Sequence, residues 1–68
     1  MFEKINSLTK RESEIFNLIL DGHDNPEIAE KLFISRSTVE THRKNMHRKL
    51  GTHSTFDILK CGFEMNII

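Results

Sequence analysis

Hydrogen-bonding and charged side chains gather on one side of the segment from Arg36 to about Leu50. With Val39 at zero and a turn of 100° per residue, Met46 and Leu50 fall within about 20° of it, and His42 lies about 60° away. The opposite side carries polar residues: Ser37, Thr41, Lys44 and Arg48, flanked by Glu40 and Asn45. One face of such a helix is committed to packing, and the other is free to bind a partner through hydrogen bonds and charge.

The residues before this segment indicate whether its polar face binds a partner or is only exposed to water. Asn25 can cap a short helix in which Pro26 suits the first position, where its missing N–H is not needed. Ile28, Ala29 and Leu32 recur at three- and four-residue spacing, so this helix has one apolar face. A tight turn follows, and Ser35 caps the helix beyond it. Two helices joined in this way hold the second one out for insertion into a DNA groove.

Two further helices are predicted on either side of this pair. Thr9 and Glu12 form a capping box at the start of a helix that Gly22 ends in the left-handed conformation. Gly51 ends the helix from Arg36, and 54–57 resembles a second capping box with Asp57 in place of glutamate. The last helix then runs to about Met65, where Asn66 can stop it. Residues 1–7 are expected to be a lead-in segment.

A series of short motifs, each present once, follows a fixed order along the chain. They are Leu8-Thr9, Arg11-Glu12, Asn25, Glu27-Ile28-Ala29, Ile34-Ser35, Thr38-Val39, His42, Asn45-Met46 and Lys49-Leu50. Taken together they resemble the C-terminal DNA-binding domain of LuxR/FixJ-type (GerE-like) bacterial transcription regulators. The resemblance covers residues 8–68. It implies an all-α, four-helix helix-turn-helix domain in which the third helix is the recognition helix, the one that enters the major groove.

The resemblance also implies a function and a set of base contacts. The function is sequence-specific binding of double-stranded DNA for transcription regulation, as the C-terminal output domain of a response regulator or a similar sensor-regulator. The base-reading positions match Glu40, Thr41 and Lys44. Lys44 can donate to guanine, Glu40 can accept from cytosine N4, and Thr41 offers a hydroxyl or a methyl to thymine. Many relatives carry lysine at position 40, so Glu40 is either a specificity residue or the partner of Lys44 in an ion pair within the helix.

Phosphate contacts are expected where N–H groups and positive charge meet the DNA backbone. The start of the recognition helix favours an anion, because its N–H groups and dipole point outward. The candidates are Asn25, Ser35, Arg36, Ser37, Thr38, Arg43 and Arg48. Two positions depart from the family pattern, since Pro26 and Thr55 stand where a lysine and an arginine are common, and each departure removes a plausible phosphate contact.

The last helix carries more apolar residues than one core-facing side needs. In the family this helix forms a dimer, so the resemblance implies a homodimer that is weak in the isolated domain and binds two DNA half-sites. The expected dimer residues are Leu59, Gly62 and Phe63. RNA polymerase is a further partner that a regulator of this kind can contact.

Charge is distributed unevenly along a chain whose net charge is zero. Residues 1–30 hold seven acidic and three basic side chains, whereas residues 31–60 hold seven basic and two acidic ones. The neutral total supports an alternative: a helical protein-interaction module without DNA binding. A sigma-factor-like promoter-binding domain is a third possibility, and the extra apolar helix after Gly51 argues against it.

Other classes of protein find little support in the sequence. His42, His47, His53 and Cys61 do not have the spacing of a zinc site, and His42 is better placed for packing at the edge of the apolar stripe. With neither a nucleophile paired to a base nor a glycine-rich phosphate loop, we expect no enzyme and no cofactor. A single cysteine suits a reducing compartment, and there is no membrane-length apolar run, so we expect a cytoplasmic location.

Overall fold

The computed structural model describes residues 6–64, and in this range the chain forms helices only. The elements are α2 (Lys10–Leu20), α3 (Asn25–Leu32), α4 (Arg36–Leu50) and α5 (Thr55–Glu64). The predicted all-α, four-helix architecture is therefore confirmed. The first five residues of the expected lead-in, and the expected helix end near Met65 and Asn66, lie outside the described residues.

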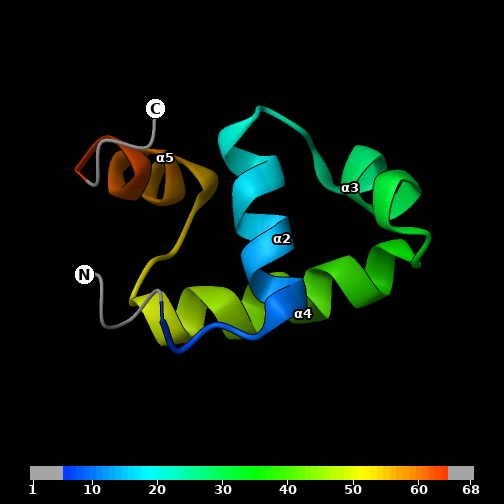
Figure 1. The fold of residues 1–68 in the computed structure, drawn as a ribbon, viewed down its shortest axis with the longest axis horizontal. Helices are drawn as coiled ribbons and strands as arrows, with labels where there is room; N and C mark the ends of the chain where they lie inside the picture. The colour runs from blue at the N-terminus through cyan, green and yellow to red at the C-terminus, as the bar shows by residue number, and fades with distance from the viewer. Residues whose placement is uncertain (1–5, 65–68) are drawn as a thin grey trace.

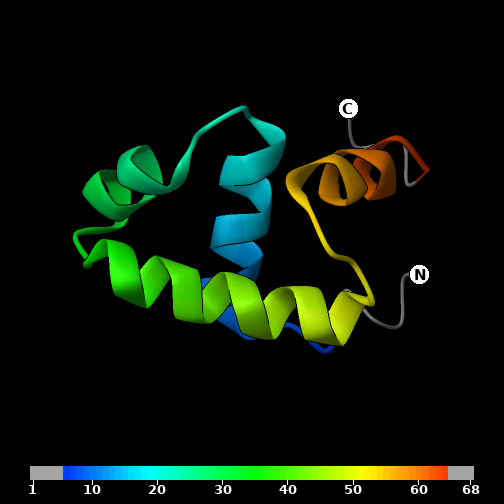
Figure 2. The ribbon, with the colours of Figure 1, turned by 180° about the vertical axis from the view of Figure 1, so that it is seen from behind.

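The longest helix, α4, runs along one edge of the domain (Figure 1). Helix α2 stands across it, with α3 and α5 on either side of α2, and the view from behind shows the same order (Figure 2). Close packing joins α2 to α4, α3 to α4 and α2 to α5. As a result, α4 has one side against the domain and one side bare.

The core explains this arrangement, because each helix contributes one apolar stripe. Val39 and Met46 of α4 are fully buried, and Leu50 is nearly so, as the periodicity of the segment predicts. They pack with residues of the other three helices: Ile15, Phe16, Ile19, Ile28, Ala29, Ile58 and Cys61. Burial of this set holds the four elements together.

The start of α2 matches the sequence prediction. The Thr9 hydroxyl accepts the Glu12 N–H at 3.1 Å, and the Glu12 carboxylate accepts the Thr9 N–H at 2.9 Å. At the other end the Gly22 N–H bonds to the Ile19 carbonyl, and the His23 N–H bonds to the Leu18 carbonyl. Gly22 has a φ of 93°, so glycine provides the left-handed turn that was predicted here.

The start of α3 differs from the prediction by one residue. Asp24, not Asn25, is the N-cap: its carboxylate accepts the Glu27 N–H at 3.0 Å, and Glu27 returns a bond to the Asp24 N–H at 3.1 Å. Pro26 is consequently the second helical residue. Asn25 is unsuited to capping here because its side-chain oxygen is bound to Arg43 of α4.

The turn between α3 and α4 contains an unusual backbone conformation. Phe33 has φ 57° and ψ 43°, the left-handed region that favours glycine, and its side chain is 94% exposed. The Ile34 N–H bonds to the Ala29 carbonyl and closes the turn. Ser35 then caps α4 by accepting the Thr38 N–H, as predicted, and Gly51 ends that helix with a φ of 70°.

The start of α5 resembles a capping box only in part. The Ser54 hydroxyl accepts the Asp57 N–H at 3.3 Å, as the sequence predicts. The Asp57 carboxylate, however, accepts the N–H of His53 and not that of Ser54, at 2.8 Å.

Candidate nucleic-acid interface

The face of α4 opposite the core is open to solvent along its whole length. Its exposed residues are polar or charged: Ser37, Glu40, Thr41, Lys44 and Arg48. The turn of 100° per residue puts these side chains away from Val39 and Met46, so burial of the apolar stripe forces them outward. The structure therefore brings all three predicted base-reading residues, and the exposed Arg48, onto one accessible surface of a single helix.

The first turn of α4 combines hydroxyl groups with free helical N–H groups. The Ser35 hydroxyl lies 3.1 Å from that of Ser37 and 2.8 Å from that of Thr38. Arg36 is exposed beside them, and the first turn of α4 contains no acidic residue. Nothing in this turn neutralises the positive end of the helix dipole, so an anion such as a phosphate is favoured here.

Glu40 and Lys44 are one turn apart on the exposed face. Within residues 6–64 neither side chain takes part in an ion pair, so the i,i+4 pair that the sequence allowed is not formed. The Thr41 hydroxyl donates to the Ser37 carbonyl at 3.1 Å. That bond leaves the hydroxyl oxygen of Thr41 free to accept a hydrogen bond, and it fixes the direction in which the methyl group points.

Arg43 is placed differently from the other predicted phosphate contacts. Its side chain is half-buried, and its guanidinium donates to Asn25 Oδ1 at 2.6 Å and to Thr55 Oγ1 at 2.7 Å. Burial also lowers the pKa of Arg43. Two of the predicted phosphate contacts, Asn25 and Arg43, are thus bound to each other.

A groove lies beside the exposed face, bordered by α4, by the first turns of α5 and by the segment that joins the end of α2 to the start of α3. Glu40, Lys44 and His47 line it from α4, and Thr55 and Leu59 line it from α5. Leu59, one of the predicted dimer residues, is half-buried in its wall. The groove therefore connects the base-reading side of α4 with the outer side of α5.

The outer side of α5 carries an apolar stripe. Phe56 is 73% exposed and Phe63 is 68% exposed, and the half-buried Leu59 lies between them at helical spacing. Gly62 is buried, so it lies on the inner side of α5 and not on this stripe. The sequence prediction omitted Phe56, although its spacing from Leu59 and Phe63 places all three on one side of a helix.

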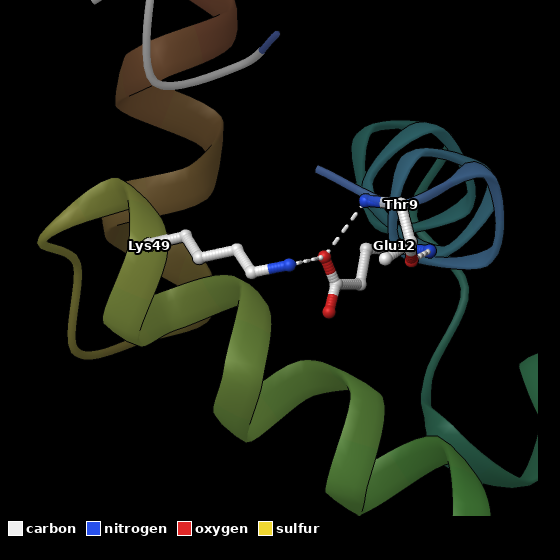
Figure 3. Close-up of polar contacts among 3 residues, drawn as sticks. All are labelled: Thr9, Glu12 and Lys49. Atoms are coloured by element: carbon white, nitrogen blue, oxygen red, sulfur yellow. Dashed lines mark hydrogen bonds and ion pairs between the residues drawn. The ribbon is translucent and has the colours of Figure 1, made fainter. Parts of the chain in front are cut away.

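One ion pair that the sequence prediction missed holds α4 to the start of α2. Lys49 Nζ lies 2.7 Å from Glu12 Oε1, the oxygen that also accepts the Thr9 N–H (Figure 3). The Glu12 side chain is only 3% exposed. Burial raises the pKa of Glu12, but the bonds from Lys49 and Thr9 outweigh burial and hold the pKa below its ordinary value.

The histidines and the cysteine occupy separate structural positions. His47 Nδ1 lies 2.7 Å from the Thr52 hydroxyl, and burial together with the nearby charge of Arg43 lowers the pKa of His47. His42 is half-buried, and Cys61 is buried in the core. Residues 6–64 contain no group of three side chains that could hold a metal ion. In the same range no helix is long and apolar enough to span a membrane.

Comparison with known proteins gives a consistent result. Residues 6–61 match the family described as bacterial regulatory proteins, luxR family. The chain is 52% identical over 62 residues to the uncharacterized response regulatory protein YgeK of Escherichia coli K12, covering 91% of the chain and 42% of YgeK. It is 45% identical over 56 residues to the DNA-binding transcriptional activator EvgA of the same strain, covering 82% of the chain and 28% of EvgA.

A solved structure shares the arrangement of the helices. The response regulator StyR superposes with a TM-score of 0.80 at 34% sequence identity, over 85% of this chain and 29% of that one. The chain thus spans less than half the length of these relatives.

Proposed function

Because the chain belongs to the luxR family of bacterial regulatory proteins, we propose that it binds double-stranded DNA in a sequence-specific manner and so regulates transcription. The observation that carries this proposal is the exposed face of α4, where Thr41, Lys44 and Arg48 lie opposite the buried Val39. A protruding helix with such a face fits the major groove, which is wide enough to admit one helix.

Base reading is assigned to three residues on this face. Lys44 donates to O6 or N7 of a guanine, Glu40 accepts from N4 of a cytosine, and Thr41 contacts a thymine through its methyl or a base through its oxygen. The exposure of all three side chains supports this assignment, as does the lack of an ion pair to either Glu40 or Lys44 within residues 6–64. An unpaired Glu40 repels phosphate, so it selects for sites that offer a cytosine.

Backbone contacts are assigned to the two ends of the same face. Ser35, Arg36, Ser37 and Thr38 at the first turn of α4 would hold one phosphate through hydroxyl and N–H groups. Arg48, which is exposed and lies about three turns away, would hold another. These contacts fix the position of the domain on the duplex but do not distinguish between bases.

The apolar stripe of α5 is the proposed dimer surface. Phe56, Leu59 and Phe63 form it, and two of these side chains are largely exposed. The area is small, so two isolated domains associate weakly and come together mainly when they occupy adjacent half-sites on DNA. A two-fold dimer of this kind calls for a site with two related halves.

The longer relatives suggest how the domain is used. YgeK and StyR are described as response regulatory proteins, and the chain matches less than half of each. We therefore infer that the domain acts as the output part of a sensor-regulator, in which a second domain controls access to DNA. A regulator that activates would in addition contact RNA polymerase.

Selection from random duplex DNA tests the function directly. Sequences retained by the 68-residue chain are expected to share a motif with two related halves, and binding to that motif is expected to weaken steeply with salt. A scrambled duplex at the same salt concentration is the control. If no duplex is retained even at low salt, the domain is a protein-interaction module.

A further inference from the structure

Arg43 joins three helices through one side chain. The residue belongs to the middle of α4, and its two acceptors, Asn25 and Thr55, are the first residues of α3 and α5. On the helical wheel Arg43 lies about 40° from Val39, on the inner half of α4. The guanidinium therefore points back into the domain, where its planar fork can serve two acceptors at once.

The bond to Thr55 matters because α4 and α5 otherwise meet only through apolar residues of the shared core, which do not fix an angle as a directional hydrogen bond does. Helix α5 packs on α2, whereas α4 packs on α2 and α3. Among residues 6–64, the bond from Arg43 to Thr55 is the one hydrogen bond found between a residue of α4 and a residue of α5. It is also short, at 2.7 Å, and its donor is charged, which makes it stronger than a neutral hydrogen bond.

We propose that Arg43 is a positioning residue that sets the angle between α4, which reads DNA, and α5, which holds the dimer. This inference rests on the proposed function and assigns to Arg43 a role other than phosphate contact. In a two-fold dimer, the angle between α5 and α4 fixes how far apart the two recognition helices lie. Arg43 thereby determines which half-site spacing the dimer accepts.

Two substitutions separate this role from a phosphate contact. Thr55→Val removes the acceptor with almost no change in shape and no change in charge. Arg43→Lys keeps the positive charge but replaces the planar fork, so one side chain can no longer bridge Asn25 and Thr55. Arg48→Ala is the control, since Arg48 is an exposed arginine of the same helix, to which a phosphate contact is assigned.

Binding is measured on a single half-site and on duplexes with two half-sites at varied spacing. Thr55→Val and Arg43→Lys are each expected to reduce cooperative binding at the preferred spacing about tenfold and to broaden the range of accepted spacings. Both variants are expected to keep the single-site affinity and its salt dependence. Arg48→Ala is expected to weaken single-site binding and to lower the slope of log K against log salt by about one unit.

Several results would overturn the proposal. A phosphate contact predicts that Thr55→Val is neutral, because it only frees a donor of Arg43, and that Arg43→Lys is close to wild type. If both variants keep the cooperativity and the preferred half-site spacing of the wild type, Arg43 is a phosphate contact and not a positioning residue. Non-cooperative binding by the wild type would also contradict the proposal, since no spacing would remain for Arg43 to set.

A measurement without DNA keeps this inference separate from the proposed function. Residual dipolar couplings of the backbone amides report the angle between α4 and α5 in solution. Thr55→Val and Arg43→Lys are expected to change that angle or its spread, whereas Arg48→Ala is not. An angle that is the same in all four proteins rules out positioning by Arg43, even if the wild type binds no duplex.

Discussion

Lys49 Nζ lies 2.7 Å from Glu12 Oε1, and this oxygen also accepts the Thr9 N–H at 2.9 Å (Figure 3). One carboxylate therefore closes the first turn of α2 and holds the last turn of α4. The Glu12 side chain is 3% exposed and that of Lys49 is 27% exposed, so solvent screens the pair only partly. The ion pair thus adds a polar link between α2 and α4 to the apolar packing that joins them.

Removing Lys49 is expected to destabilise the fold. Lys49→Met keeps the apolar part of the side chain but leaves the buried Glu12 carboxylate without its cation. The free energy of unfolding is expected to fall by about 1–3 kcal/mol at pH 7, as measured by urea denaturation. Lys60→Met, at an exposed position of α5, is the control and is expected to change stability by less than about 0.5 kcal/mol.

The effect of Lys49→Met is also expected to depend on pH. In the wild type the pKa of Glu12 lies below its ordinary value of 4.5, so Glu12 stabilises the fold above that pH, and this contribution is lost as the pH falls through the lower folded pKa. A protonated Glu12 is neutral, so it forms no ion pair with Lys49 and loses little when Lys49 is removed. The difference between wild type and variant is therefore expected to be full at pH 7 and to shrink below pH 4.5; a constant difference would show that the pair contributes nothing.

Phe33 is expected to be a site where substitution stabilises the domain. Its left-handed backbone conformation is costly for a side chain that cannot hydrogen-bond to the local backbone, and Phe33 is 94% exposed, so little packing is lost when the ring is removed. Phe33→Asn is expected to raise the free energy of unfolding by about 1 kcal/mol, because asparagine tolerates this conformation.

Phe33→Ala separates the backbone effect from the loss of the ring. Alanine has no polar side-chain group to hydrogen-bond to the local backbone, so it keeps the strain, and this variant is expected to match the wild type in urea denaturation. If alanine stabilises as much as asparagine does, the exposed ring and not the backbone is the source of the cost.

Lys44 is expected to contribute both affinity and sequence preference. Lys44→Ala removes a donor from the centre of the exposed face and is expected to weaken binding to the selected site by about 1–3 kcal/mol and to relax one base position. Lys31→Ala, which removes the same charge from the exposed side of α3, is the control. Equal losses in the two variants, with unchanged base preference, would reduce the role of Lys44 to its charge.

Phe63 is expected to act in dimerisation and not in folding. Phe63→Glu places a charge on the outer stripe of α5, where the ring is 68% exposed, and is expected to abolish cooperative binding to two half-sites while sparing a single half-site. Asn17→Glu adds the same charge at an exposed position of α2, away from both α5 and the first turn of α4, and serves as the control. Circular dichroism must show intact helices in both variants, and full cooperativity in a folded Phe63→Glu protein would place the dimer surface elsewhere.

Local features of the sequence predicted most of the fold. The capping box at Thr9, the cap at Ser35 and the stop at Gly51 act over a few residues, and the periodicity of α4 identified Val39, Met46 and Leu50 as buried. Such signals are readable because their physical cause lies within one or two helical turns.

The errors occurred where a side chain has more than one possible partner. Asp24 and Asn25 are both good N-caps, and the choice between them depends on Arg43, which is 18 residues further along the chain than Asn25. The ion pair of Glu12 with Lys49 spans 37 residues, so no local pattern indicates it. Arg43 could have been placed on the inner side of α4 from the same helical wheel that placed Val39, because the two lie only about 40° apart.

The uneven distribution of charge gives this neutral domain an electric dipole. Basic side chains gather on α4, and acidic ones outnumber basic ones on α3 and on the loop that precedes it. Because the net charge is zero, DNA does not attract the domain electrostatically over long distances. Within a screening length of about 8–10 Å, however, the electric field of the duplex acts on the dipole and orients the domain. The outcome of an encounter therefore depends on orientation. A domain whose α4 faces the duplex is attracted and stays bound long enough for base contacts to form, whereas a domain whose α3 faces the duplex is repelled.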